Sequence, residues 1–221
     1  EAVKRLADRV RIPLPEPEYS AEAARKEKLK QQIYDMHRQA GRYYYAALHS
    51  RNGEKALEYL NRRGVEPEIQ KKFGIGYAPQ GRDNLYKYLS SKGFDREAMV
   101  KSGLVMESKD GRGLYDRFFN RLMFPIFDIQ GRAIAFGGRI IDKGEPKYLN
   151  SPETAVFSKS RTLYGMNFAK AARKREIILV EGYMDMISIY QAGFPNVVAG
   201  LGTAFNGEHA ATLRKLADSV I

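Results

Sequence analysis

The stretch "IILVEGYMDMISIYQ" (residues 177–191) joins a short apolar run to a helical pattern through one acidic residue and one glycine. The apolar run predicts a strand, and the pattern after the glycine predicts a helix. The predicted order is strand Ile177–Val180, helix Met184–Gln191, strand Val197–Ala199, helix Gly207–Ala217 and an opening strand Ser219–Ile221. This β-α-β-α-β alternation predicts a parallel sheet with right-handed crossovers.

Two acidic residues occupy the edge of this sheet where ligands usually bind, outside the carboxyl ends of the strands. Glu181 follows the strand directly, Gly182 permits a sharp turn, and Asp185 falls on the first turn of the next helix. Mg²⁺ is often held by one or two carboxylates together with waters and phosphates. The alternative is that Asp185 only stabilises the helix through its interaction with the helix dipole, and that Glu181 is a solvent-exposed residue at the end of the strand. The spacing alone leaves both interpretations open.

The preceding part of the chain has a different pattern. Residues Arg11–Tyr19 hold three prolines and predict an extended tether, and a long amphipathic helix follows from the N-cap Ser20 to about Ser50. The shorter helices that we predict are Glu54–Arg63, one that begins at Pro67, Asn84–Lys92 and Arg96–Ser102. From Leu104 onward strands alternate with turns, and "RLMFPIFD" and "RAIAFGGRII" predict a hairpin around "IQGR".

The chain is strongly basic. Its 37 lysines and arginines exceed its 26 acidic residues, which gives a net charge of +11. Such a surplus favours a polyanionic partner, although charge alone leaves open a merely soluble basic protein. The absence of cysteine excludes a disulfide framework and a thiolate zinc site within these residues. The three histidines, His37, His49 and His209, share no metal-ligand spacing, and we expect them on the surface or in a groove.

No apolar run approaches the roughly 20 residues that a membrane-spanning helix needs. The first residues, "EAVKRLADRV", lack the apolar core of a signal peptide. They also lack an initiator methionine, and the last residues stop inside a predicted strand. We therefore expect an excised fragment with chain missing on both sides.

Three blocks resemble a known family in the same order. The residues "ILVEGYMDMISIYQAGFPNVVAGLGTAF" resemble the first half of a Toprim domain, the metal-binding module of primases and topoisomerases. Upstream, "YDRFFNRLMFPIFDIQGRAIAFGGRII" and "PKYLNSPET" resemble blocks of bacterial replicative DNA primases of the DnaG type. The resemblance implies an α/β chain, in which a mixed α+β subdomain precedes a partial Toprim-type parallel fold. The implied division is a linker over 1–19, a basic subdomain over 20–160 and a truncated Toprim part over 161–221.

The resemblance also implies an activity. A primase is a DNA-directed RNA polymerase that makes short primers from ribonucleoside triphosphates on single-stranded DNA. Glu181 would be the invariant acid, as metal ligand or general base, and Asp185 would assist in binding Mg²⁺, for which Mn²⁺ can substitute. Zinc is expected only in a separate N-terminal module. The implied partners are template, RNA primer, nucleotides and a replicative helicase that binds through a region absent here, with no membrane, in the bacterial cytoplasm at the replication fork.

Basic and aromatic residues of the middle blocks suit phosphates and bases. A cationic turn region with Tyr148 filling a crevice would give the same pattern. The resemblance assigns several of them to the nucleotide and template groove: Arg63, Arg139, Lys147, Tyr148, Asn150 and Lys159. Tyr183 would shield the metal crevice or serve in packing. Gly137 and Gly138 would let the backbone approach phosphate, or would mark a tight bend.

One departure from the family limits these inferences. The family carries an Asp-x-Asp pair on the strand after the second helix of the Toprim module, and this sequence ends at "SVI". We therefore expect an incomplete metal site and a fragment that is inactive alone. The rival interpretations are another Toprim enzyme, either a nuclease or a type IA topoisomerase, and a single-stranded DNA-binding module without activity.

Overall fold

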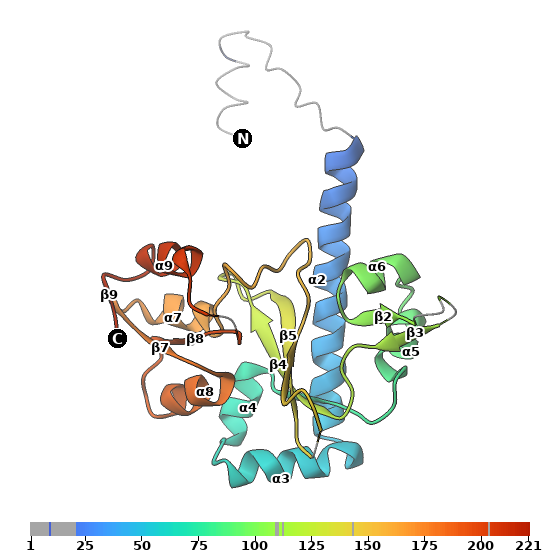
Figure 1. The fold of residues 1–221 in the computed structure, drawn as a ribbon, viewed down its shortest axis with the longest axis horizontal. Helices are drawn as coiled ribbons and strands as arrows, with labels where there is room; N and C mark the ends of the chain where they lie inside the picture. The colour runs from blue at the N-terminus through green and yellow to red at the C-terminus, as the bar shows by residue number, and fades with distance from the viewer. Residues whose placement is uncertain (1–8, 10–20, 109–110, 112, 143, 203) are drawn as a thin grey trace.

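The computed structural model describes residues 9, 21–108, 111, 113–142, 144–202 and 204–221. The described residues form three sheets and a long helix, α2 (Ala21–Leu48). An antiparallel sheet and, beyond it, the parallel sheet lie on one side of α2, and a small region of helices and a two-stranded sheet lies on the other (Figure 1). The tether predicted over 1–19 lies outside the described residues except for Arg9, and so does the predicted N-cap Ser20.

Helix α2 has the predicted length and its apolar stripe is buried. Its buried apolar residues are Ile33, Met36, Ala40, Tyr44 and Leu48. Their spacing of three and four residues places them on one face, while residues Ala21–Lys28 are all exposed. Of the run Tyr43–Tyr45, Tyr44 is buried, at 1% exposure.

Five shorter helical segments precede or flank the first sheet: η1 (Arg51–Gly53), α3 (Glu54–Arg62), α4 (Pro67–Phe73), α5 (Asn84–Ser91) and α6 (Arg96–Lys101). The last four confirm the predicted helices to within one residue. Asp95 caps α6, because its Oδ1 accepts a hydrogen bond from Ala98 N at 2.8 Å. Helix α5 is capped from outside instead: the Asp116 carboxylate accepts from Leu85 N and Tyr86 N, each at 2.8 Å.

The first sheet is antiparallel in the order β1-β4-β5-β6. Its strands are β1 (Gly76–Ala78), β4 (Arg121–Phe127), β5 (Ala133–Ile140) and β6 (Tyr148–Asn150), and a separate pair joins β2 (Val105–Glu107) to β3 (Leu114–Asp116). Strands β4 and β5 form the predicted hairpin, with Arg121 opposite Ile140. Met123 and Phe136 pack with the buried residues of α2, whereas Phe124 and Ile134 pack with the C-terminal region.

The C-terminal region confirms the predicted alternation. It comprises α7 (Met166–Ala172), β7 (Glu176–Val180), α8 (Tyr183–Gln191), β8 (Val197–Ala199), α9 (Gly207–Arg214) and β9 (Ser219–Val220). Strand β7 is central, and both β8 and β9 pair with it in parallel. Alternate residues of β7 belong to different apolar clusters, so both faces of the strand are covered.

The histidine prediction was wrong for two of three residues. His37 and His209 are 0% and 1% exposed, and only His49 lies on the surface. Each buried imidazole hydrogen-bonds a backbone carbonyl that is distant in sequence: Ser102 O at 3.0 Å from His37 Nε2, and Lys159 O at 2.8 Å from His209 Nε2. Polar character suggested exposure, but in the core a distant carbonyl pairs with Nε2 of each ring, while neither Nδ1 has a hydrogen-bond partner among the described residues.

Candidate nucleic-acid and metal site

The two predicted acids lie at the carboxyl end of the central parallel strand. Glu181 follows β7 at a bend, and Asp185 lies in the first turn of α8. Both side chains are exposed, and an ideal Cβ on Gly182 would lie 3.3 Å from Asp185 Oδ2, so that carboxylate lies close to the turn after Glu181. Within the described part of the chain, no group of three or more histidine or acidic side chains could hold a metal ion.

The donor set nevertheless fits a hard cation. Carboxylate oxygens are the ligands that Mg²⁺ takes, and the ion commonly keeps several waters and binds substrate phosphates besides one or two carboxylates. Glu181 and Asp185 provide that minimum, on a strand end and a helix start whose backbone the core fixes. The two carboxylates therefore fit the donor requirement of a hard divalent cation.

Tyr183, between the two acids, is a packing residue. It is 3% exposed, and its ring stacks at 5.2 Å on Phe124 and meets Tyr164 edge-on at 4.7 Å. An ideal Cβ on Gly137 would lie 2.4 Å from the Tyr183 ring, so glycine at this point of β5 lets α8 approach the sheet. Burial raises the pKa of Tyr183, which keeps its hydroxyl protonated as a donor.

The two glycines of β5 therefore have a packing role that neither sequence interpretation anticipated. A Cβ on Gly138 would lie 2.9 Å from the Phe118 ring, as the one on Gly137 would meet Tyr183. Strand β5 continues through both positions without a bend. Aromatic rings, rather than phosphate, occupy the space that the missing side chains leave.

Arg139 lies at the centre of a row of cationic and aromatic side chains. Its guanidinium carbon is 5.0 Å from the ring centre of Tyr59 and 5.2 Å from that of Tyr148. Its Nη1 also donates to Tyr148 Oη at 2.5 Å. Arg139 is only 8% exposed, and cation–π contacts strengthen as the groups lose water. The structure thus holds this guanidinium between two rings.

Arg63 extends the row from the end of α3. Its Nε donates to Tyr59 Oη at 3.0 Å, and its guanidinium lies 5.5 Å from the centre of the same ring. We call Arg63, Tyr59, Arg139 and Tyr148 the cation–aromatic ladder. Tyr59 was missed in the sequence, although it stands four residues before Arg63 on a predicted helix, the spacing at which helical side chains meet.

Asn150 connects the ladder strand β6 to the C-terminal region. Its Oδ1 accepts from Tyr183 Oη at 2.7 Å, and its Nδ2 donates to Leu201 O at 2.6 Å. Its backbone oxygen accepts from Nε and Nη2 of Arg117 at 3.1 and 3.0 Å. The side-chain amide of Asn150 is thus engaged within the chain, and Arg117 is a second neighbour that sequence reasoning missed.

The two lysines of the predicted groove lie apart from each other. Lys147 is exposed immediately before β6, next to Tyr148. Lys159 lies in the segment before α7, where its amide donates to Glu153 Oε1 at 2.8 Å and its carbonyl accepts from His209. The structure therefore brings Arg63, Arg139, Tyr148, Asn150 and Tyr183 together, and it ties the Lys159 backbone to α9.

Electrostatics link Asp185 to the ladder. The pKa of Tyr148 is raised, mainly by burial, while Arg139 opposes the rise and Asp185 adds to it. The Asp185 carboxylate is therefore close enough to the Tyr148 hydroxyl to disfavour its ionisation. Exposed carboxylates next to held cations suit an anionic ligand that arrives with a divalent cation. Among the described helices, none has the length and hydrophobicity needed to cross a bilayer.

Comparisons with known proteins point to the same kind of protein along the whole chain. A model of the DNA primase catalytic core, N-terminal domain, matches residues 43–170, and a model of the Toprim domain matches residues 175–221. The DNA primase of Clostridium acetobutylicum is 43% identical over 222 residues, which cover 100% of this chain and 36% of that protein. The chain thus spans about a third of the length of the curated relatives it matches.

Solved structures agree with these matches. A structure of the DnaG primase catalytic domain bound to ssDNA superposes with a TM-score of 0.82 at 36% identity, covering 88% of this chain and 61% of that chain. A DNA primase domain from Pseudomonas aeruginosa gives a TM-score of 0.80 at 46% identity, covering 85% of this chain and 60% of that chain. The mixed α/β fold predicted from the sequence is confirmed, and the chain belongs to the DnaG-type family of DNA primases, of which it contains the N-terminal catalytic-core domain and Toprim-domain residues.

Proposed function

We propose that this chain supplies the template and nucleotide groove, and part of the metal site, of a DNA primase. The reaction is the joining of ribonucleoside triphosphates into a short RNA primer on single-stranded DNA. The observation that carries the proposal is that Tyr148 of the cation–aromatic ladder lies within electrostatic reach of Asp185, which is four residues after Glu181 at the start of α8. A nucleotidyl transfer needs both, because its substrates are polyanions and its metal needs carboxylates.

In this proposal each group has a defined task. Arg139 and Arg63 hold phosphates of the template or nucleotide with guanidinium groups that Tyr59 keeps in place. Lys147 adds an exposed ammonium beside them. Tyr148 offers a half-buried ring edge to a base. Asn150 and Tyr183 fix β6 against α8, which sets the spacing between these groups and the acids. Lys159 contacts the template further along the groove.

Glu181 and Asp185 would hold Mg²⁺, with Mn²⁺ as a substitute. When bound, the metal lowers the cost of deprotonating the attacking 3′ hydroxyl and offsets charge on the leaving pyrophosphate. Glu181, which is exposed at its bend and has no hydrogen bond or ion pair from its side chain to the described residues, serves as ligand or general base. The remaining partners, the RNA primer and a replicative helicase, and the location at a bacterial replication fork follow from the same proposal.

The 221 residues alone should bind single-stranded DNA without making RNA. Support comes from the acids: within the described residues no group of three or more histidine or acidic side chains could hold a metal ion, and the sequence contains no Asp-x-Asp pair. We retain the division into a linker (1–19), a basic subdomain (20–160) and Toprim residues (161–221) as part of this proposal. Template-dependent incorporation of ribonucleotides by the purified chain would contradict it.

Binding tests the groove directly. The affinity of the chain for an oligothymidylate should fall steeply with salt, because bound cations release counterions from phosphates. The double variant Arg139→Ala, Lys147→Ala should bind about tenfold more weakly at low salt, with a salt slope shallower by about 1 to 1.5. Arg214→Ala, Lys215→Ala removes the same charge at the far end of α9 and is the matched control. If both variants lost the same affinity at unchanged melting temperature, the binding would depend on the overall positive charge and not on a specific groove.

A further inference from the structure

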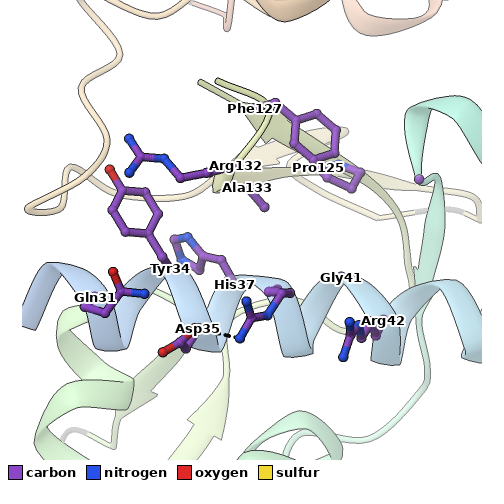
Figure 2. A pocket seen from close by; sticks show the side chains of 13 residues that line it. Gln31, Tyr34, Asp35, His37, Gly41, Arg42, Pro125, Phe127, Arg132 and Ala133 are labelled. Atoms are coloured by element: carbon purple, nitrogen blue, oxygen red, sulfur yellow. Dashed lines mark hydrogen bonds and ion pairs between the residues drawn. The ribbon is translucent and has the colours of Figure 1, made fainter. Parts of the chain in front are cut away.

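A cavity lies away from the ladder, between α2 and the tip of the β4–β5 hairpin. Its volume is about 370 Å³, within the usual range for small-molecule pockets. Figure 2 shows α2 along one side, with Tyr34, His37 and Gly41, and the strands along the other, with Pro125 and Phe127. The cavity borders Arg132 and Ala133 at the start of β5, whereas Arg139 lies near its end, roughly 20 Å along the strand.

The inner walls of this cavity are largely apolar, and its charged lining residues lie around the opening. Pro125, Phe127 and Ala133 form the sheet side. On the helix side His37 is fully buried and hydrogen-bonded to Ser102 O at 3.0 Å. An apolar space with fixed walls favours a flat hydrocarbon or heteroaromatic ring over a polar or extended ligand.

Arginines surround the opening. Arg132 lies with its guanidinium 4.1 Å from the ring centre of Tyr34, and its Nε donates to Asp128 Oδ2 at 2.8 Å, so the planar group is fixed in place. Arg38 pairs with Asp35 at 2.8 Å. Arg42 has no carboxylate partner in the part of the chain that the structure describes, and its side chain is exposed at the rim. A fixed guanidinium plane can stack on a ring, and a free one can bind an acid group.

Glycine at position 41 keeps the cavity open. An ideal Cβ there would meet nothing within 4 Å, although Gly41 lies in the interior of α2 with ordinary helical backbone. Glycine weakens a helix interior relative to alanine or leucine, and no packing contact requires it here. The space in front of this glycine is the cavity itself. A larger residue at 41 would therefore fill the cavity without disturbing the fold.

We propose that this cavity binds a planar aromatic anion, a flat ring system with one acidic group of the size of a mononucleotide or an aromatic sulfonate. The ring enters between Gly41 and Phe127 and meets the Arg132 plane, while the acid group pairs with Arg42. This site is separate from the proposed template groove, and its existence does not depend on the activity proposed above.

The test uses anilinonaphthalene sulfonate and adenosine 5′-monophosphate as probes, with calorimetry on the whole chain. At least one should bind with 1:1 stoichiometry, and the one that binds identifies the source as a nucleotide or a non-nucleotide aromatic acid. Gly41→Leu should weaken that binding at least tenfold with an equal or higher melting temperature. Gly41→Ala is the matched control: it gives the same helix benefit but leaves most of the space, so it should bind nearly normally.

A second variant tests the charge without touching the core. Arg42→Glu should weaken binding of either probe about tenfold, because Arg42 is exposed and its reversal leaves the fold intact. Four results would each overturn the proposal. The first two are that neither probe binds, and that Gly41→Leu binds the probe as tightly as the wild type does. The others are that inorganic sulfate, which has no ring, competes as well as the probe itself, and that an oligothymidylate displaces the probe, which would place the cavity in the template path.

Discussion

The two acids, Glu181 and Asp185, and the cation–aromatic ladder are built in opposite ways. Every ladder side chain is held by another: Arg63 by Tyr59, and Arg139 by Tyr59 and Tyr148. Glu181 and Asp185 are exposed, and no ion pair or side-chain hydrogen bond is found for either among the described residues. The ladder is thus preformed by the chain, whereas the acids await ligands from outside it.

This difference predicts which property each region controls. Held cations bind phosphate with little reorganisation, so the ladder should determine template affinity. Free carboxylates contribute little to stability, so their loss should leave the fold and DNA binding nearly unchanged. Their contribution should appear only when a metal and a reacting nucleotide are present.

The largest expected effect is that of Glu181→Gln on primer synthesis. In a protein that carries this chain followed by the rest of a Toprim domain, we expect about a thousandfold loss of rate, equivalent to ~4 kcal/mol of transition-state stabilisation. The amide has almost the same shape, but it binds Mg²⁺ poorly and accepts no proton near neutral pH. Primer yield against Mg²⁺ concentration measures the effect.

A second variant, and measurements of DNA affinity and melting temperature, show whether the acids act separately from the ladder. Asp185→Asn should be milder, since Asp185 is assigned only an assisting role in metal binding. Oligothymidylate affinity and melting temperature should be nearly those of the wild type in both variants. Normal priming by a folded Glu181→Gln protein would remove Glu181 from the catalytic assignment, and a large loss of DNA affinity would mean that the acids also organise the ladder.

The sequence was sufficient for the fold because its signals were local. The periodicity of α2, the "IQGR" hairpin and the β-α-β-α-β alternation all appear where they were predicted. The backbone placement of Glu181 and Asp185 followed from the same alternation.

The side-chain contacts of the site could not be predicted in this way. Tyr59 reaches Arg139 across 80 positions in the sequence, and Arg117 reaches the Asn150 carbonyl across 33. The packing role of Gly137 depends on Tyr183, which only the completed fold brings to it. Likewise His37 was placed wrongly because its partner, Ser102, is 65 residues away. Long-range contacts of this kind leave no local pattern.

A fall in pH should weaken the core between α2 and β5 through the buried His37, whose ring meets Phe136 edge-on. Burial lowers the pKa of His37 from its ordinary value of 6.5 to about 4. Between these values the unfolded chain binds a proton that the folded chain excludes. Stability should therefore be fully retained above pH 6.5 and fall as the pH drops toward 4, by ~3 kcal/mol from this residue.

Chemical denaturation at several pH values measures this contribution. His37→Gln cannot titrate, so it should be less stable than the wild type at pH 7 but lose less stability on acidification. His49→Gln removes an exposed histidine of the same helix region and should keep the wild-type pH dependence. If the free energies of unfolding of His37→Gln and the wild type fall by the same amount on acidification, groups other than His37 cause the acid sensitivity. The core behind the sheet would then not limit the stability of the ladder.

The smallest effect, and the sharpest test of the ladder, comes from Tyr59. Tyr59→Phe keeps the ring between the two guanidinium groups but removes the oxygen that accepts from Arg63 Nε. Tyr59→Leu removes the ring as well. Because cation–π contacts are worth about 0.5 to 2 kcal/mol each and a hydrogen bond about 1 kcal/mol, Tyr59→Phe should weaken oligothymidylate binding by only a few-fold, and Tyr59→Leu by more.

The salt dependence separates positioning from charge in these variants. Neither substitution removes a cation, so the salt slope should stay close to that of the wild type while the affinity falls, unlike the shallower slope expected for Arg139→Ala, Lys147→Ala. Tyr190→Phe controls for general packing. Tyr190 packs against the same core cluster, but its ring contacts Phe73 instead of an arginine of the ladder. If Tyr59→Leu bound DNA as the wild type does, at unchanged melting temperature, the cations would not need to be held, and the contrast between a preformed ladder and free acids would fail.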